Sequence, residues 1–183
     1  MKKTLLIGLA LIIVLLTPAC SCSGSNSNGE DGGRSSQSNS STVKDFELTI
    51  YSDKEIYKTT DKIQIWATLV YSGNEETVTI WHGLPSIGFS VSDGKDFHTE
   101  SITLTVLTST TLGKGVVYSF PFEKTGVYDN NAPNANFWKK YYSNPDLVLP
   151  AGEYTITVTG GFSLSPGAID IGLSTELKIK VVK

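Results

Sequence analysis

The chain has 183 residues, and its 15 Lys or Arg and 18 Asp or Glu residues give a formal net charge of −3 at neutral pH. No segment gathers its Lys and Arg into a basic stripe, so nucleic acid and anionic lipid headgroups are poor candidates as direct partners. Both cysteines lie within the first 22 residues, so the domain that follows them has no disulfide to stabilise it.

The N-terminal segment has the composition of a secretory signal. Two lysines precede an apolar run over residues 4–16, and Ala19 comes directly before Cys20. The run is shorter than the about 20 apolar residues that a membrane-spanning helix needs. The end of the segment resembles the lipobox of bacterial lipoprotein precursors, in which a small residue precedes a lipidated cysteine.

This resemblance implies a signal peptide over residues 1–19 and a lipid-modified Cys20, with Cys22 as the alternative lipid site. Two acyl chains such as palmitate hold a protein stably on a membrane, whereas one chain binds marginally. We therefore expect a lipid-anchored protein on the extracytoplasmic side of the cell membrane. Removal of the two N-terminal lysines takes its charge from −3 to −5. The alternative is ordinary secretion with cleavage after Ala19.

A polar segment follows the predicted lipid site. Residues 21–42 are mainly Ser, Gly and Asn and contain no large apolar side chain. Such a segment cannot bury enough surface to offset the entropy lost on ordering, so we expect residues 20–42 to be the lipidated cysteine and a disordered linker. A coil of about 20 residues would reach roughly 25 Å.

The remainder, residues 43–183, is the right size for one domain and alternates apolar and polar residues with period 2. The alternation predicts an all-β fold, an immunoglobulin-like antiparallel β-sandwich of about eight strands. The apolar positions expected on inner faces are Phe46/Leu48/Ile50, Ile63/Ile65/Ala67/Leu69, Val78/Ile80, Phe89/Val91, Ile102/Leu104/Val106, Tyr118/Phe120/Phe122, Tyr154/Ile156/Val158 and Leu177/Ile179/Val181.

Two short motifs narrow the class. The segment 149–154, Leu-Pro-Ala-Gly-Glu-Tyr, resembles the tyrosine corner of immunoglobulin-like folds, in which a tyrosine hydroxyl bonds to the backbone a few residues upstream. Together with the turn Val91-Ser92-Asp93-Gly94 and an early Tyr-rich strand pair, the order of elements is similar to that of the BsuPI (intracellular proteinase inhibitor) domain. That resemblance implies a protease inhibitor, but it assigns no inhibitory residues.

The sequence offers little that indicates catalysis. His82 and His98 are the two histidines, and neither belongs to a recognisable motif. His82 shares the parity of Val78 and Ile80, which favours an inward-facing histidine with satisfied hydrogen bonds at the end of its strand. We therefore expect no catalytic residues, no enzyme activity and no cofactor.

Carboxylates cluster near two predicted turns. Asp53, Glu55 and Asp61 form one group, and Asp93 and Asp96 flank a Gly-Lys pair. Turn carboxylates bind Ca²⁺ in some sandwiches, but Asp also favours turns for backbone reasons. The second explanation is preferred, so we predict no metal site.

Two tryptophans are placed together by a predicted hairpin. With Gly73 and Asn74 at the centre of a two-residue turn, the register puts Trp66 opposite Trp81 on the outer face, away from the core. Tryptophan is enriched at binding hot spots, so this pair is a candidate binding platform.

The connection over residues 124–148 is unusually long for a compact domain and is either a structural lid over the tryptophans or a binding surface. We call it the excursion. A helical turn or two is expected over residues 136–142, capped by Asn134. The candidate binding residues of the excursion are its aromatic ones, namely Tyr128, Phe137, Trp138, Tyr141 and Tyr142.

Taken together, these patterns predict a membrane-anchored, non-catalytic binding or interaction module of the bacterial cell envelope. Its partner would be an unknown envelope protein or glycan, bound at Trp66 and Trp81 or at the excursion. The alternatives are a protease inhibitor of the BsuPI type and a purely structural envelope lipoprotein.

Overall fold

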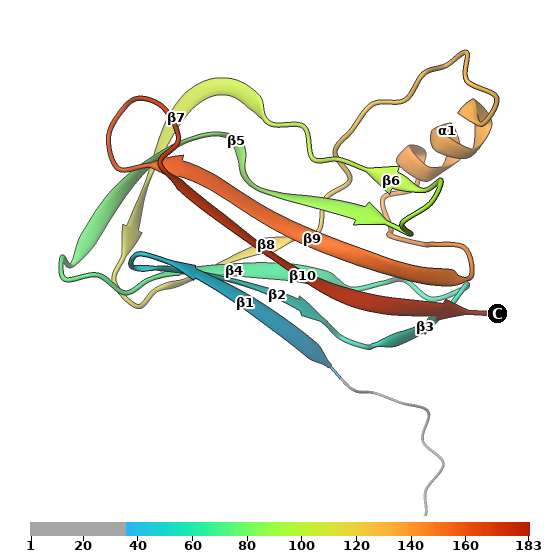
Figure 1. The fold of residues 1–183 in the computed structure, drawn as a ribbon, viewed down its shortest axis with the longest axis horizontal. Coiled ribbons are helices and arrows are strands. Elements are labelled where there is room, and N and C mark those ends of the chain that lie inside the picture. The colour runs from blue at the N-terminus through green and yellow to red at the C-terminus, as the bar shows by residue number, and fades with distance from the viewer. Residues whose placement is uncertain (1–35) are drawn as a thin grey trace, which may run out of the picture. The chain divides into compact units, whose positions relative to one another are not determined.

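The computed structural model describes residues 36–183, which form an all-β sandwich with one helix (Figure 1). The predicted all-β sandwich is confirmed, with ten strands instead of about eight. The predicted signal peptide, Cys20 and Cys22 lie outside the described residues. The elements are β1 (Gln37–Val43), β2 (Phe46–Ser52), β3 (Ile56–Lys58), β4 (Ile65–Tyr71), β5 (Thr77–Ser92), β6 (His98–Thr99), β7 (Leu104–Gly113), β8 (Val117–Pro121), α1 (Ala135–Ser143), β9 (Gly152–Ser163) and β10 (Ile171–Val182).

The strands form two packed layers (Figure 1). The four-stranded sheet has the order β1-β2-β4-β8, and the six-stranded sheet has the order β3-β10-β9-β5-β6, with β7 also paired to β5. Among the named strands of the described residues, only β3 and β10 pair in parallel. Helix α1 lies at one end of the sandwich, beside β6. No helix within residues 36–183 has the length and apolar character that crossing a membrane requires.

The core follows directly from the period-2 patterns of β2, β4, β9 and β10. Buried and outward-facing positions alternate along these strands. In the register, Leu48 lies opposite Leu69 and Ile156 opposite Leu177, and all four are at most 5% exposed. Full burial of such a side chain contributes about 1.5–3 kcal/mol, so the two inner faces hold the sandwich together without a disulfide.

The predicted tyrosine corner is confirmed. The hydroxyl of Tyr154, at the start of β9, donates to the carbonyl oxygen of Pro150 at 3.1 Å. The bond connects the first residues of β9 to the segment that leads into the strand, and Tyr154 is buried. Its geometry is the one that the local sequence predicts.

The folded domain begins earlier than predicted. Residues 37–42 were expected in the disordered linker, but Gln37–Val43 is strand β1, antiparallel to β2. The side-chain amides of Gln37 and Asn39 donate to the carbonyl oxygens of Lys178 and Glu176 in β10, at 2.6 and 2.9 Å. A polar segment can therefore be ordered as an edge strand, because its backbone pairs with β2 and its side chains bond to the facing sheet. Composition alone does not reveal those partners.

The predicted pairing of Trp66 with Trp81 is wrong. Strand β4 is already paired on both sides, by β2 and β8, so the chain crosses to the other sheet and β5 pairs with β7 and β9. Gly73 lies in this crossing and packs against the Tyr71 ring so closely that a side chain at that position would overlap the ring. The chain therefore passes from one sheet to the other at this glycine, where the sequence predicted the two-residue turn of a hairpin.

Strands β5 and β7 also depart from prediction. The two strands expected around residues 78–80 and 89–91 are parts of the single long strand β5. Leu104 and Val106, expected on an inner face, are 57% and 56% exposed. Strand β7 pairs only with β5 among the described strands, and its register shifts between Leu104 and Thr108. The alternation of apolar and polar residues therefore predicted strand β7 correctly, but it did not predict that the apolar side chains of β7 are exposed.

Candidate functional site

One half-buried lysine, Lys124, joins the two ends of the excursion. Lys124 Nζ donates to the carbonyl oxygens of Tyr141, Asn144 and Asp146, at 2.9, 2.8 and 2.6 Å. It also lies 4.2 Å from the centroid of the Tyr141 ring. These carbonyls are at and just beyond the C-terminal end of α1, where backbone acceptors lack helical partners and a cation is favourable. Burial lowers the pKa of the Lys124 ammonium, and the charge of Asp146 opposes that shift.

Phe97, in the turn before β6, is the aromatic side chain on which α1 packs. Its ring centroid lies 5.3 Å from that of Trp138 and 5.5 Å from that of Tyr141, and it also contacts Tyr154 at the tyrosine corner. Burial, followed by the nearby Tyr142 hydroxyl, raises the pKa of Tyr141. The excursion is therefore attached at Phe97, and the aromatic contacts that its described side chains make do not include Trp66 or Trp81.

A small cavity, which we call the aromatic hollow, opens between α1 and the chain that precedes it. Its volume is about 230 Å³. Three of its lining residues are candidate binding residues from the sequence; the complete lining is His98, Val127, Tyr128, Asp129, Ala132, Asn134, Trp138 and Tyr142.

The three aromatic rings of the hollow are nearly aligned. The Tyr128 and Tyr142 rings are stacked, with centroids 5.8 Å apart and planes 9° apart. The Trp138 ring lies 6.1 Å from Tyr142 and is tilted by 30°. Gly126 helps to bring the two tyrosines together: its φ is +150°, and a side chain there would overlap the Tyr142 hydroxyl.

The polar side chains of the hollow were not identified as binding residues from the sequence. Asn134 is the N-cap residue of α1, as predicted, but its side chain makes no capping hydrogen bond. Asp129 Oδ1 accepts from the backbone N–H of Asn131 at 2.8 Å, and His98 Nε2 lies 3.1 Å from Glu100 Oε1. In the sequence, only the position of Asp129 directly after the candidate residue Tyr128 could have indicated that it belongs to the site. His98 could not be identified in this way, because it lines the hollow only through the packing of β6 beside the excursion.

The other two candidate residues of the excursion lie elsewhere. Phe137 and Tyr141 line a separate cavity of about 260 Å³, together with Thr59 and Leu149. Tyr141 is 7% exposed and belongs to the core, whereas Phe137 is 40% exposed. The five predicted aromatic residues are thus divided between two sides of α1.

Trp66 and Trp81 do not form a common surface. Trp66 stacks on Tyr51, with ring centroids 5.3 Å apart and planes 6° apart, so one of its faces is already occupied. Trp81 lies in the other sheet, between Ser109 of β7 and Ser163 of β9. Each tryptophan is half-buried, and neither is part of the aromatic hollow.

His82 has both ring nitrogens engaged. It is 5% exposed; Nδ1 donates to the Gly83 carbonyl oxygen at 2.7 Å, and Nε2 lies 2.8 Å from the Thr110 hydroxyl. The prediction of an inward-facing, satisfied histidine is confirmed, although the residue lies within β5 rather than at its end.

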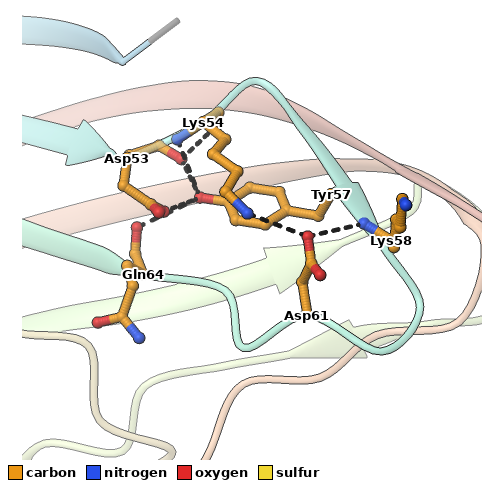
Figure 2. Close-up of polar contacts among 7 residues, drawn as sticks. Asp53, Lys54, Tyr57, Lys58, Asp61 and Gln64 are labelled. Carbon is orange, nitrogen blue, oxygen red and sulfur yellow. Dashed lines mark hydrogen bonds and ion pairs between the residues drawn. The ribbon is translucent and has the colours of Figure 1, made fainter. Parts of the chain in front are cut away.

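The carboxylates near the turns are occupied by hydrogen bonds. Figure 2 shows Asp53 accepting from the Tyr57 hydroxyl at 2.5 Å and Asp61 accepting from the Lys58 N–H and from Lys54 Nζ, each at 3.1 Å. The Lys58 N–H and then Lys54 lower the pKa of Asp61, while burial raises the pKa of Tyr57. These contacts organise the turns around the short strand β3.

Asp93, from the second group of turn carboxylates, also organises its turn through hydrogen bonds. Asp93 Oδ1 accepts from the backbone N–H groups of Lys95 and Phe97, at 2.8 and 3.0 Å, and these bonds lower its pKa against the opposing effect of burial. Within residues 36–183, no three His, Cys, Asp or Glu side chains are grouped so that they could hold a metal ion. The Asp93 turn instead positions Phe97, and through it α1.

Comparison with known proteins adds little. No protein-family model matches the chain, and no curated protein matches it. Among solved structures, the chain is similar to a protein from Archaeoglobus fulgidus that is 11% identical in sequence. The match covers 81% of this chain and 97% of the other, with a TM-score of 0.25.

Proposed function

We propose that this protein is a non-catalytic binding module of the bacterial cell envelope, held on the membrane by a lipid at Cys20, and that it binds its ligand at the aromatic hollow. The lipobox-like N-terminus supports the anchor. Because β1 begins at Gln37, residues 21–36 would connect the lipid site to the domain. The partner is an envelope protein or glycan.

The hollow itself is the observation on which this proposal rests. It combines three aromatic rings with the side chains of Asp129 and Asn134, all from the excursion, and with His98 from strand β6. Concave sites that mix aromatic surface with a few convergent polar groups are where proteins most often bind ligands.

Affinity capture tests the proposal. The chain from residue 20 onward, carrying Cys20→Ser and Cys22→Ser, would be immobilised and exposed to envelope extract and culture medium. A Tyr128→Ala/Asn134→Ala variant removes two lining side chains, and Lys139→Ala, an exposed residue of the same helix, is the matched control outside the hollow. We expect a defined partner to be captured by the parent and the control only. Equal capture by all three contradicts the proposed site.

The anchor has its own test. Metabolic labelling with a palmitate analogue should modify the full-length chain, and Cys20→Ser should abolish the label. Label that persists in Cys20→Ser and disappears in Cys22→Ser would move the lipid site to Cys22. An enzyme would be indicated instead if the purified chain showed a turnover that His98→Ala removes.

A protease inhibitor is the second candidate, and one loop favours it. The connection between β9 and β10, residues 164–170, is exposed throughout, with Leu164 and Ile169 45% and 64% exposed. An inhibitor should present such a loop and resist cleavage in it. A peptidase panel in which Leu164→Asp abolishes inhibition would support this function. A protein that neither captures a partner nor inhibits any peptidase would have a purely structural role.

A further inference from the structure

We propose that the aromatic hollow binds one uncharged sugar residue of an envelope glycan. This inference rests on the proposed function, since it names the ligand class of the same site. It is carried by the orientation of the rings, the mixture of polar groups, the charge of the lining and the size of the cavity.

The ring orientation favours a flat ligand. Tyr128 and Tyr142 stack on each other with planes 9° apart, which leaves the other face of each ring for a ligand, and Trp138 is within 30° of Tyr142. A pyranose ring presents a face of C–H groups, which carry partial positive charge and pack well on the negative face of an aromatic ring. A quaternary ammonium ion is bound best where ring faces surround it from several directions. Nearly aligned rings do not provide that enclosure.

The polar side chains suit neighbouring hydroxyl groups. Each sugar hydroxyl both donates and accepts, so adjacent hydroxyls need a mixture of acceptors and donors. The Asn134 amide supplies both kinds, and its side chain is not used in capping α1. Asp129 supplies acceptors, and the His98 imidazole, whose Nε2 contacts Glu100, has its Nδ1 left for a ligand. Charge-assisted bonds to a carboxylate are among the stronger hydrogen bonds, which makes Asp129 the principal polar contact.

The charge of the lining excludes acidic sugars. Asp129 is its one carboxylate, and no Lys or Arg is among the lining residues. A phosphate or a uronic acid carboxylate would approach Asp129 without a compensating cation, and like charges in a partly enclosed site are unfavourable. A neutral hexose or N-acetylhexosamine has no such penalty.

The volume limits the ligand to one residue. The hollow measures about 230 Å³, which is below the range of about 300–1,000 Å³ typical of sites for drug-sized molecules. A single pyranose is the unit that such a cavity would enclose. The rest of the glycan would extend outward from the open side.

Titration with defined sugars tests the inference. Methyl glycosides of neutral hexoses and N-acetylhexosamines would be added to the ¹⁵N-labelled chain from residue 20 onward, and the Trp138 indole N–H signal would be followed by NMR. We expect saturable shifts at Trp138 with at least one glycoside, and none with methyl glucuronide. Asp129→Asn and Asn134→Ala should each weaken the affinity about tenfold, the effect of losing one good hydrogen bond. Lys139→Ala, on the exposed side of the same helix, should leave it unchanged.

Three controls make the result decisive. Tyr128→Phe keeps the ring, so it should bind more strongly than Tyr128→Ala even if the alanine variant is less stable. Saturable shifts with tetramethylammonium in place of every glycoside would overturn the sugar assignment. Periodate, which cleaves neighbouring hydroxyl pairs, should abolish capture from envelope extract. Capture that depends on the hollow but survives periodate, with no glycoside bound, would reject a sugar ligand and leave the binding module intact. No capture and no glycoside binding would reject both.

Discussion

The sandwich core and the excursion are stabilised in different ways. The core is formed by inner faces whose residues are contributed repeatedly by β2, β4, β9 and β10, and most of its members are at most 5% exposed. The excursion has two buried core residues, Tyr141 and Leu147, its helix packs on Phe97, and Lys124 joins its two ends. Stability in the core is distributed over many side chains, whereas in the excursion it depends on a few.

This difference has a functional consequence. The aromatic hollow lies on the segment with the fewer attachments, so its shape can change without unfolding the sandwich. Binding segments are commonly drawn from the less stable parts of a structure. Substitutions in the core should weaken the whole domain, whereas substitutions in the excursion should act on that segment alone.

The largest effect is expected in the core. Ile156 in β9 is fully buried, and Ile156→Ala should lower the free energy of unfolding by about 2–5 kcal/mol, because it removes apolar contacts and leaves a cavity. Urea unfolding followed by circular dichroism measures the loss. The outward-facing neighbour is the control: Thr157→Ala should change stability by less than about 0.5 kcal/mol. Similar losses for both would show that the alternation does not determine burial.

The Tyr57 hydroxyl should come next. Tyr57 is 1% exposed, and its hydroxyl bonds to Asp53 and to the Ser52 hydroxyl, at 2.5 and 2.7 Å. Tyr57→Phe keeps the ring but leaves these partners unsatisfied, which should cost about 1–3 kcal/mol. Tyr51→Phe, in β2 of the four-stranded sheet and half-buried, should cost much less.

The same residue predicts a pH dependence. Burial and the Asp53 hydrogen bond raise the pKa of Tyr57 in the folded state above the value of about 10 in the unfolded chain. Its contribution to stability is therefore complete below about pH 10 and decreases as the pH rises beyond that value. The measurement is the urea midpoint at pH 8 and at about pH 11. The midpoint should fall less between these pH values in Tyr57→Phe than in the parent. An identical decrease in both proteins would contradict the assignment.

A smaller and local effect is expected at Lys124. Lys124→Met keeps much of the aliphatic chain near Tyr141 but removes the donor to three carbonyls, so it should cost about 1–2 kcal/mol in the excursion. Hydrogen exchange of α1 amides should accelerate, while exchange in β9 stays close to that of the parent. Lys140→Met, in the exposed last turn of α1, is the matched control. Equal acceleration by both variants would show that capping by Lys124 is not what holds the helix.

The smallest effect on stability is expected at Asn134. A side chain that caps a helix contributes about 1 kcal/mol, but the Asn134 side chain makes no such bond. Asn134→Ala should therefore change the midpoint of thermal unfolding very little, while it weakens ligand binding. A loss of stability close to that of a lost cap would show that Asn134 serves the helix and not the hollow.

Local patterns predicted a substantial part of the fold. The inner faces of β2, β4, β9 and β10 follow from period-2 alternation, since successive side chains point to opposite sides of a strand. The tyrosine corner joins residues only four apart, so its bond could be read from the sequence at 150–154. Helix α1 and the position of its N-cap were also predicted, because apolar spacing and capping are local as well.

The failed predictions concern the choice of neighbours. Alternation shows that β4 has one apolar face but not which strands pair with its two edges, and the turn residues at 73–74 suggested the wrong one. Strand β1 has no apolar signal, since its order comes from pairing with β2 and from amide bonds to β10. Leu104 and Val106 alternate like core residues, but β7 lies at an edge where nothing described covers them.

Local sequence patterns therefore account for the all-β class, the core faces of the central strands, the tyrosine corner and the aromatic character of the excursion. Long-range packing places β4 and β5 in different sheets, which separates Trp66 from Trp81. It also decided that His98 meets Tyr128, Asn134 and Trp138 around one cavity. The physical reason is that backbone periodicity and short motifs act between residues close in the chain. Strand pairing and the lining of a cavity depend instead on which distant segments bury their surfaces together.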